Sequence, residues 1–384
     1  MIDVDIATPL STSGRFIVDA QGNRVRLAGV NWYGASEDLG VPVGLDKTPR
    51  DSLAQLIAGL GFNCVRFPFS VWMTEQTTAV PDEYLAANPD LQGKTPIQVY
   101  DACVQTLTEW GLIVIPNCHL MDFGWCCKTG DTNGLWFNDH WESEQFSAAW
   151  QEIVKRYASN PLVAAVDVKN EPRQATVGGH VLNPTWGPGD PTDFAAMYTT
   201  IGNTIHGLNP HLLIICEGLG FATDLSGVAA HPVKLTQPNK VVYSMHDYSW
   251  FHPAGQSQAD YAAQMDKAGG YILDQKIAPL WIGEFGDTAS ALDAQVTDPD
   301  SGGWFGNIKA WLTGNDIDWC WWALNPVHGK GSVPGTSQVE YTWGQPEPYG
   351  LLAADWATVP YNNLIAELQS MIEPQTGPGV ATST

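Results

Sequence analysis

The chain has 384 residues, long enough for one large domain or two ordinary ones, and 44% of them are hydrophobic, with 17 Trp. Its formal net charge is −23 with only 18 Lys and Arg, which argues against nucleic acid and anionic membranes as partners, because both need clustered basic side chains. No apolar run approaches the roughly 20 residues that span a bilayer.

The chain begins MIDVDIATPL, with acidic residues where a signal peptide would carry basic residues and an apolar core. The acidic, Lys-poor and aromatic-rich composition is typical of a secreted protein that meets a neutral substrate. We therefore expect an extracellular protein whose signal peptide is not visible in this chain. Residues 13–27, SGRFIVDAQGNRVRL, with a turn at Gln21 and Gly22, predict a small hairpin that covers the bottom of the fold.

Short apolar runs rich in β-branched residues recur along the chain and predict eight β-strands. They lie at residues 25–32, 63–69, 112–119, 164–170, 212–218, 241–247, 279–285 and 318–324. Because these runs are almost continuously apolar, the strands should be buried on both faces, which is typical of a parallel sheet.

Amphipathic helical patterns alternate with these strands. The clearest lie at residues 48–61, 143–159, 193–208 and 361–373, the first with Thr48 as its cap and Pro49 in its first turn. Eight strands with interleaved helices predict an α/β fold, a (β/α)8 TIM barrel with long βα loops. A doubly wound open sheet is the alternative, but no Gly-rich phosphate turn follows any strand.

The barrel is expected to form a single catalytic domain over residues 1–373. Residues 374–384 are rich in Pro, Gly, Thr and Ser without periodicity and are interpreted as a tail or the start of a linker.

The chain has seven cysteines, enough for three disulfides and one free thiol. Four of them lie in apolar strand runs, where they are expected to be small core residues: Cys64, Cys118, Cys216 and Cys320. Cys126 and Cys127 are adjacent in a loop and form either a vicinal disulfide or two free thiols.

In a TIM barrel, side chains at the carboxyl ends of the strands carry the chemistry. The sequence places polar and aromatic residues at these ends: Asn31, Trp32, Arg66, His119, Asn170, Glu171, Glu217, His246, Tyr248, Glu284, Trp321 and Trp322. A single His or Arg at such a position is usually a satisfied structural group. Three carboxylates and two histidines on one rim are much harder to explain as packing.

Two glutamates on different strands are what retaining glycoside hydrolysis requires, because one must protonate the leaving oxygen while the other attacks the anomeric carbon. The strands that precede Glu171 and Glu284 face each other across a closed barrel, which makes these two the better pair on position. Glu217 is the rival candidate, and position alone does not exclude it.

The surroundings of the two glutamates should separate their pKa values. Arg66 and the Tyr248 hydroxyl would hold Glu284 ionised, whereas burial and the negative neighbour would keep Glu171 protonated. Asn170 is placed to hydrogen-bond the sugar 2-hydroxyl. Flat aromatic faces for stacking on sugar rings are assigned to Trp32, Trp136 and Trp322, although part of the set of 17 Trp must belong to the core.

Five motifs, VDVKNEPR, WIGEFGD, VYSMHDYS, CVRFPF and GVNWYG, resemble glycoside hydrolase family 5 of clan A, the cellulase family, and the match runs from about Val25 to Pro326. The resemblance implies that Glu171 is the acid/base and Glu284 the nucleophile, with Glu217 in a supporting role. It also implies the rest of the site: Arg66, His119, Asn170, His246, Tyr248 and Trp322. The segment DFGWCCKTGDTNGLWFND resembles a branch of the family with a Trp-Cys-Cys loop after the third barrel strand.

The resemblance implies a retaining hydrolase of β-linked glycans, first an endo-β-1,4-glucanase that acts on β-glucan as a monomer, without metal or other cofactor. A carbohydrate-binding module beyond the tail would fit the same family. A β-mannanase, a xyloglucanase or an exo-acting β-glycosidase is the alternative, and the segments 120–141, 172–191 and 325–350 should decide between them.

Two other classes are disfavoured by the sequence. A carbohydrate-binding pseudoenzyme would have lost one of the two glutamates, and both are present. Metal catalysis through His119, Asp122 and Asp247 lacks the spacing of a known site.

Overall fold

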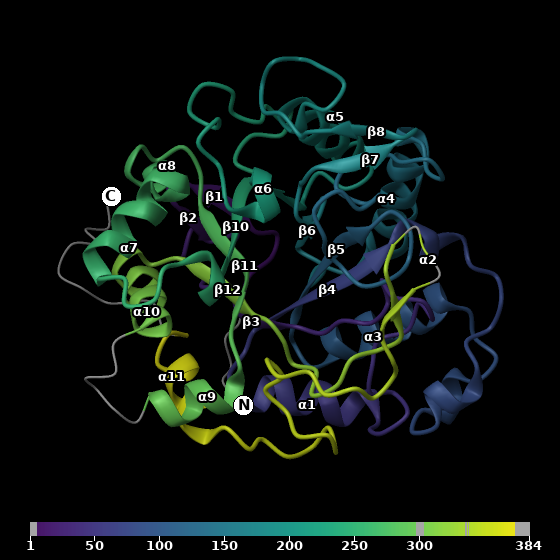
Figure 1. The fold of residues 1–384 in the computed structure, drawn as a ribbon. Helices are drawn as coiled ribbons and strands as arrows, with labels where there is room; N and C mark the ends of the chain where they lie inside the picture. Colours follow the sequence, from purple (N-terminus) through teal and green to yellow (C-terminus); the bar gives the residue numbers. More distant parts are fainter. Residues whose placement is uncertain (1–5, 297–302, 335, 337, 373–384) are drawn as a thin grey trace.

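The computed structural model describes residues 6–296, 303–334, 336 and 338–372. Eight parallel strands close into a barrel in chain order (Figure 1). They are β3 (Ala28–Asn31), β4 (Cys64–Ser70), β5 (Ile113–Leu120), β6 (Ala165–Asp167), β9 (Leu213–Glu217), β10 (Val241–Tyr248), β11 (Leu280–Gly286) and β12 (Asp318–Trp321). The (β/α)8 prediction is confirmed, and every predicted strand is present.

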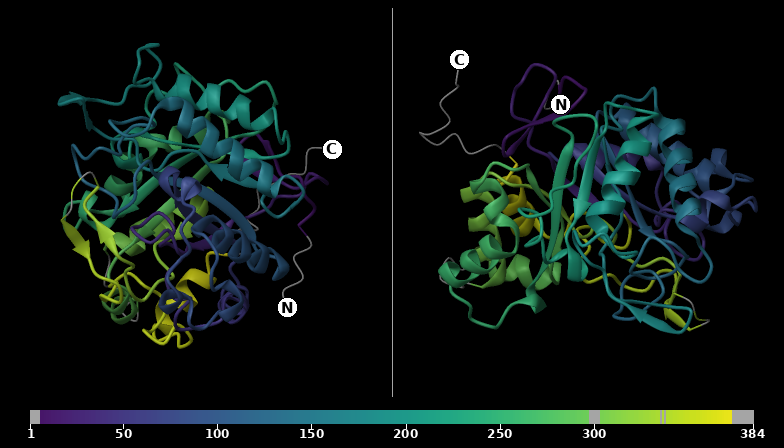
Figure 2. Two further views of the ribbon diagram at one scale, coloured as in Figure 1. Left: turned by 90° about the vertical axis from the view of Figure 1, so that its right-hand side faces the viewer. Right: turned by 90° about the horizontal axis from the view of Figure 1, so that it is seen from above.

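Helices surround the barrel on the outside (Figures 1 and 2). The longer ones are α1 (Arg50–Gly59), α3 (Pro96–Glu109), α4 (Ser143–Tyr157), α5 (Phe194–His206), α7 (Gln258–Met265), α10 (Trp304–Asn315) and α11 (Asn362–Gln369). Shorter ones are α2 (Val71–Glu75), α6 (Leu219–Ala222), α8 (Tyr271–Asp274) and α9 (Ala289–Gln295). The four predicted helices correspond to α1, α4, α5 and α11. The predicted cap of α1 is wrong, because the helix follows Pro49 without a side-chain cap.

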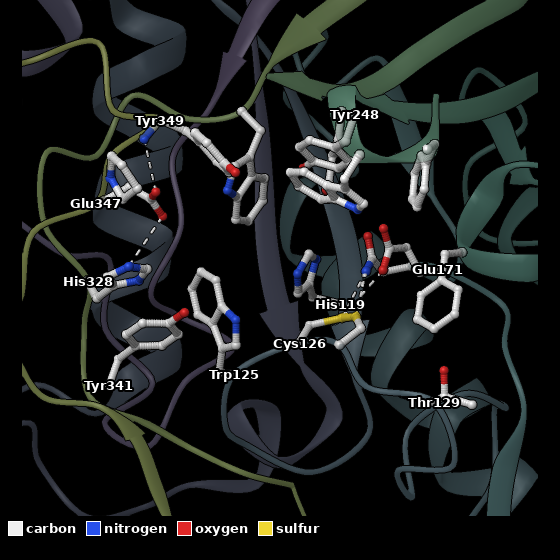
Figure 3. Close-up of a pocket in the computed structure, with 18 residues that line it drawn as sticks. His119, Trp125, Cys126, Thr129, Glu171, Tyr248, His328, Tyr341, Glu347 and Tyr349 are labelled. Atoms are coloured by element: carbon white, nitrogen blue, oxygen red, sulfur yellow. Dashed lines mark hydrogen bonds and ion pairs between the residues drawn. A yellow bond between two sulfur atoms is a disulfide. The ribbon is translucent and has the colours of Figure 1, made fainter. Parts of the chain in front are cut away.

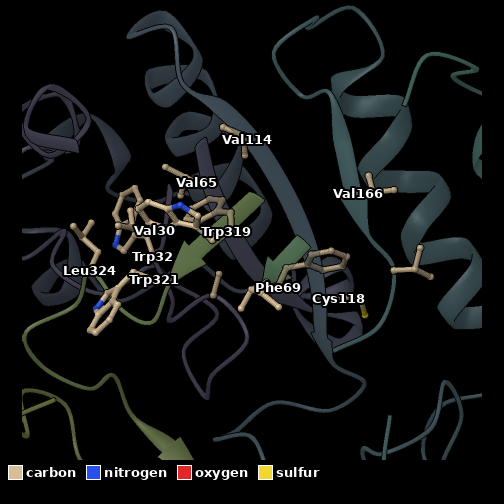
Figure 4. Packing of buried hydrophobic residues seen from close by; sticks show 14 of the residues in the cluster. Val30, Trp32, Val65, Phe69, Val114, Cys118, Val166, Trp319, Trp321 and Leu324 are labelled. Carbon is tan, nitrogen blue, oxygen red and sulfur yellow. The ribbon is translucent and has the colours of Figure 1, made fainter. Parts of the chain in front are cut away.

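Side chains of the barrel strands alternate between the barrel interior and the helices. Cys64 and Ile113 pack inside the lower barrel, whereas their neighbours Val65 and Val114 belong to the large core under the helices. Figure 4 shows this outer packing, with Trp319 on the same side as Val65. By the same alternation Arg66 points back into the barrel, which places a charged layer above the apolar one.

A hairpin covers the amino-terminal end of the barrel, as predicted. Its strands β1 (Ser11–Ser13) and β2 (Phe16–Val18) turn at Gly14, which has a φ of 57°. The expected turn at Gln21 and Gly22 adds only one bridge, between Val18 and Arg24. Ile17 packs with the interior side chains of the barrel and closes its bottom.

Two ribbons lie in the long loops at the opposite end of the barrel from the hairpin (Figure 2). The loop after β6 forms β7 (Ala175–Val177) and β8 (His180–Leu182), and the loop after β12 forms β13 (Gly331–Ser332) and β14 (Val339–Tyr341). Within the described ranges no helix has the length and apolar character needed to cross a bilayer. The predicted tail at 374–384 lies outside the described residues.

Candidate active site

A cavity of about 500 Å³ opens at the carboxyl ends of the barrel strands (Figure 3). Six of the ten predicted site residues line it: His119, Asn170, Glu171, Tyr248, Glu284 and Trp322. Arg66 and His246 lie beneath it, fully or almost fully buried. The structure therefore brings together eight residues that are scattered over the sequence.

Glu171 and Glu284 meet in this cavity from two strands that β9 and β10 separate in the barrel. Glu171 follows β6, and Glu284 lies on β11. One carboxylate oxygen of each lies within 4.8 Å of the other. Both residues are buried, with 8% and 4% of their surface exposed.

Glu284 is surrounded by hydrogen-bond donors. Arg66 Nη1 donates to its Oε1 at 2.5 Å, and the Tyr248 hydroxyl donates to its Oε2 at 2.8 Å. His246 Nδ1 lies 3.5 Å from Oε2. Arg66 and the Tyr248 hydroxyl are the two partners of Glu284 that the sequence predicted.

Glu171 has a different environment. Burial raises the pKa of Glu171, and the negative charge of Glu284 raises it further, while a hydrogen bond from His246 acts against both. That bond joins His246 Nδ1 and Glu171 Oε1 at 3.0 Å. Burial lowers the pKa of His246, but the charges of Glu284 and Glu217 outweigh it and the net pKa is raised. The net pKa of Glu171 is raised above its usual range, which favours its protonated form.

The backbone before Glu171 explains how the carboxyl group reaches the cavity. β6 ends at Asp167, three residues earlier than predicted, and Glu171 has a φ of 45°, in the left-handed region that few non-glycine residues adopt. The Glu171 N–H donates to Glu217 Oε2 at 2.6 Å, and the Asn170 N–H donates to the Cys118 carbonyl at 2.9 Å. These bonds replace the regular strand ladder and fix the turn.

Arg66 joins the buried charged layer below the cavity. Its Nε donates to Asp167 at 2.7 Å, and its Nη2 donates to Glu217 at 2.9 Å and to Asn170 at 2.6 Å. One guanidinium faces three carboxyl groups here, counting Glu284. Burial raises the pKa of Asp167 well above its usual range, and the charge of Glu217 adds to this. Asp167 was not predicted as a site residue. It is the one charged residue in the apolar run VAAVDV, and a charge in such a buried strand could have indicated a functional role.

Glu217 does not line the cavity. It is fully buried, and its carboxylate is occupied by Arg66 and by the Glu171 N–H. Its position is that of a supporting group, as the family resemblance implied.

The aromatic predictions have mixed outcomes. Trp322 lines the cavity, stacked on Tyr33 at a centroid distance of 4.9 Å. The sugar-stacking role predicted for Trp32 is wrong, because its ring is fully buried against Phe67 and its Nε1 donates to the Val43 carbonyl.

Trp136 also lies outside the residues that line the cavity. Its ring is half-buried and packs edge-on against Phe137 and Phe194. Sequence reasoning missed several loop residues that do line the cavity: Trp125, Phe221, Trp250, His328, Tyr341, Glu347 and Tyr349. Apart from Trp136, it considered residues at or beside strand ends, whereas these residues lie in the long segments that follow the strands.

Cys126 and Cys127 form a disulfide at the cavity wall (Figure 3). The Asn170 side-chain amide donates to their sulfurs at 3.3 and 3.6 Å, and the Cys126 sulfur lies 3.9 Å from Glu171 Oε2. Of the two alternatives left open by the sequence, the structure has the disulfide. The other five cysteines are free and buried.

Comparisons with known proteins bear on the family and the fold of the chain. The family model described as Cellulase (glycosyl hydrolase family 5) matches residues 18–328. An endoglucanase of Paenibacillus polymyxa is 29% identical over 357 residues, which cover 88% of this chain and 84% of the relative. A glycosyl hydrolase 5 family protein of Chamaecyparis obtusa is 30% identical over 401 residues, which cover 97% of this chain and 67% of the relative.

Among solved structures, the catalytic domain of the major endoglucanase from Xanthomonas campestris pv. campestris is similar to this chain. The two structures superpose with a TM-score of 0.76 at 23% sequence identity. The aligned part covers 94% of this chain and 99% of the Xanthomonas chain. At 23% identity this similarity supports the fold alone.

Proposed function

The chain belongs to the cellulase family, glycosyl hydrolase family 5, and within it we propose an endo-β-1,4-glucanase that cleaves β-glucan with retention of configuration. The observation that carries this proposal is the separation of the Glu171 and Glu284 carboxylates, whose nearest oxygens lie within 4.8 Å. Retaining enzymes hold their carboxyl groups about 5–5.5 Å apart, whereas inverting enzymes leave room for a water between them. The endoglucanase of Paenibacillus polymyxa supports the substrate class.

In the proposed mechanism Glu284 is the nucleophile and Glu171 the acid/base. Glu284 attacks the anomeric carbon while Glu171 gives its proton to the leaving oxygen. Once Glu284 is bound to the sugar it no longer carries a charge, so one of the causes that raise the pKa of Glu171 disappears. Glu171 is then suited to take a proton from the incoming water.

Neighbouring groups position the sugar and the nucleophile. Arg66 and Tyr248 orient the Glu284 carboxylate through one hydrogen bond to each oxygen. Asn170 has its carbonyl held by Arg66, so its amide N–H groups face the cavity, where among the described residues they are accepted only by the two sulfurs of the disulfide. Sulfur is a weak acceptor, and a sugar 2-hydroxyl is a stronger partner for this amide.

An exposed ring at the cavity favours a polymeric substrate. Trp250 lines the cavity, is 56% exposed and stacks on Tyr248 at a centroid distance of 4.4 Å. Such a face suits a further sugar beyond the two glutamates, as an endo-acting enzyme needs.

Hydrolysis of a soluble β-1,4-glucan is expected, with the β-anomer as the first product, because two displacements at one carbon restore its configuration. Proton NMR of the products in the first minutes, before mutarotation, measures this. An initial α-anomer would exclude the two-step mechanism. Cleavage of mannan or xyloglucan without cleavage of unsubstituted β-glucan would exclude the assigned substrate.

Activity is expected to follow a bell-shaped pH profile with an acidic optimum. Burial and the Glu284 charge raise the pKa of Glu171, so its protonated form persists above the usual range of a carboxylic acid, and activity falls as the pH rises through that value. On the acidic side activity falls because the attack on the anomeric carbon needs an ionised carboxylate. The two limbs belong to the coupled pair. Measured kcat/KM that stays flat up to about pH 9 would contradict a carboxylic acid donor.

Replacement of both Cys126 and Cys127 by Ser is expected to alter loop order and substrate range while the chemical step remains. Turnover of a small activated aryl glycoside should stay within about tenfold, or roughly 1.4 kcal/mol of barrier, because the serine hydroxyls still accept from Asn170. Thiol titration of the unfolded, unreduced wild type should find the five free cysteines. A loss of about a thousandfold or more with the fold intact would place the pair in the catalytic machinery.

The same disulfide bears on the compartment. Disulfides persist in oxidising surroundings, so the Cys126–Cys127 bond and the net charge of −23 support an extracellular enzyme that acts as a monomer on a neutral polymer. A carbohydrate-binding module beyond residue 384 would fit this proposal.

A further inference from the structure

The turn that brings Glu171 to the cavity is held by two side chains that the mechanism does not use. Arg173 Nη1 donates to the Glu171 carbonyl at 2.9 Å. The same guanidinium donates to Asp131 Oδ2, from Nη2 at 2.7 Å and from Nε at 3.3 Å. Arg173 therefore joins the backbone of Glu171 to Asp131, which lies in the loop that follows β5.

Asp131 holds this loop through both of its carboxylate oxygens. Oδ2 also accepts from the Lys128 N–H at 3.1 Å, directly after the disulfide, and Oδ1 accepts from the Asn133 N–H at 2.9 Å. The Asn133 side-chain carbonyl in turn accepts from the N–H groups of the two residues that follow β5, at 2.8 and 2.9 Å. The contacts of Glu171 are thus continuous with the end of a barrel strand.

Backbone contacts join the two segments at the same place. The Arg173 N–H donates to the Gly134 carbonyl, and the Thr176 N–H donates to the Asp131 carbonyl, both at 3.2 Å. Gly134 is needed for this approach, because a Cβ at that position would lie 2.2 Å from the Arg173 carbonyl oxygen. The side chains of Arg173 and Asp131 therefore meet between two backbone segments that are already in contact.

The ion pair is buried, with 1% of the Arg173 side chain and 2% of the Asp131 side chain exposed. The removal of two charges from water costs free energy that their attraction only partly offsets, so a buried ion pair is weak evidence for a role in stability. This pair has another contact, the Glu171 carbonyl. Glu171 has a φ of 45°, and non-glycine residues keep such a backbone conformation only where their surroundings hold it.

We propose that Arg173 and Asp131 are positioning residues, which hold the Glu171 carboxyl group where it can protonate the leaving oxygen. This step rests on the proposed function, in which Glu171 is the acid/base. Neither Arg173 nor Asp131 lines the cavity, so both act through Glu171 and not on the substrate. A displaced carboxyl group slows mainly those substrates whose leaving oxygen needs the proton.

Two aryl β-cellobiosides with leaving groups of different acidity test this proposal, and kcat/KM reports the step that releases the aryl group. In Arg173→Met, kcat/KM for the phenyl cellobioside, which has a poor leaving group, should fall about tenfold to a hundredfold. The value for the dinitrophenyl cellobioside, which has a good one, should change by less than about threefold. Arg173→Lys keeps the charge and should lie between Arg173→Met and the wild type.

The same substitution in Glu171→Ala gives a readout that a purely structural role would not produce. If Arg173 acts through the Glu171 carboxyl group, Arg173→Met should cause no further loss on the phenyl cellobioside there, because the effects of coupled residues do not add. Asp131→Asn keeps the size of the side chain and should show the same selective loss. It decides the question if circular dichroism finds Arg173→Met unfolded.

The alkaline limb of the kcat/KM profile gives an independent readout. The charged and titratable groups around Glu171 include Glu217 on β9, His246 and Tyr248 on β10, Glu284 on β11, and Arg173. Burial and the Glu284 charge raise the pKa of Glu171, whereas the positive charge of Arg173 lowers it. Arg173→Met should therefore move the limb to higher pH. Asp131→Asn leaves the Arg173 charge unbalanced and should move it to lower pH.

Arg156→Met is the matched control, because Arg156 on α4 pairs with Asp101 on α3 at 2.5 Å, outside the barrel. It should leave both substrates unchanged. Equal losses on the two cellobiosides, or a further loss in Glu171→Ala, would overturn the proposal, and so would an alkaline limb that neither variant moves. Failure of the proposed function would look different, since Glu171→Ala would itself then slow good and poor leaving groups equally.

Discussion

Replacement of Glu284 by Gly is expected to reduce turnover of every substrate by about a thousandfold or more, because the proposed nucleophile is lost and no glycosyl-enzyme can form. The pocket behind it should persist. Arg66 keeps its bonds to Asp167 and Glu217, so the barrel retains its buried charged layer. A small anion such as azide or formate can then occupy the space of the lost carboxylate. From a substrate with a good leaving group it should form an α-configured product, because only one inversion has taken place.

The product stereochemistry of this rescue gives the role of Glu284. Proton NMR of the azide adduct identifies the anomer, and circular dichroism with thermal unfolding verifies that the variant is folded. Glu340 does not line the cavity, so Glu340→Gln, prepared in the same way, is the control and should keep wild-type activity. A β-azide from Glu284→Gly would reverse the assignment of the two glutamates.

The barrel could be predicted from the sequence because its signal is local. Each strand is a short, almost continuously apolar run, and burial on both faces follows from that run alone. α4 shows the same for helices, since the amphipathic pattern at residues 143–159 repeats at helical spacing and its apolar residues Phe146, Trp150 and Ile153 are buried. Closure of the sheet then brings the strand ends together, which is why eight of the ten predicted site residues meet.

Trp32 was misassigned although the alternation of a strand predicts its direction. Asn31 points into the barrel, where its Oδ1 accepts from Arg66. Its neighbour must therefore face the helices, and Trp32 packs there on Phe67. The prediction relied on the position of Trp32 at the end of a strand and neglected the alternation of side chains between the two faces of that strand.

The loop residues of the cavity could not be predicted from local patterns. Glu347 and Trp125 come from segments about 220 residues apart, and tertiary contacts alone place them. The Asp38 carboxylate accepts from the Ser332 N–H at 2.8 Å, which ties the loop after β12 to the loop after β3. The Trp125 N–H donates to the Ser332 carbonyl at 2.8 Å, which ties in the loop after β5. Such contacts between three loops leave no periodic trace in the sequence.

Replacement of Glu171 by Ala is expected to separate the two chemical steps. A substrate with a poor leaving group needs the proton, so its kcat/KM should fall by about a hundred- to ten-thousandfold. An aryl glycoside with a good leaving group needs little protonation, so the first step should survive and release the aryl group as a burst while the glycosyl-enzyme accumulates. Stopped-flow absorbance measures the burst, and mass spectrometry detects the sugar on Glu284.

Azide should rescue Glu171→Ala in the second step, because it attacks the glycosyl-enzyme without a general base. Two inversions then give a β-azide, the opposite anomer from that of Glu284→Gly. Loss of the His246 partner at Glu171 Oε1 should not block this, since His246 still faces Glu284 and Glu217. Equal losses for good and poor leaving groups, or an α-azide from Glu171→Ala, would show that Glu171 is not the acid/base.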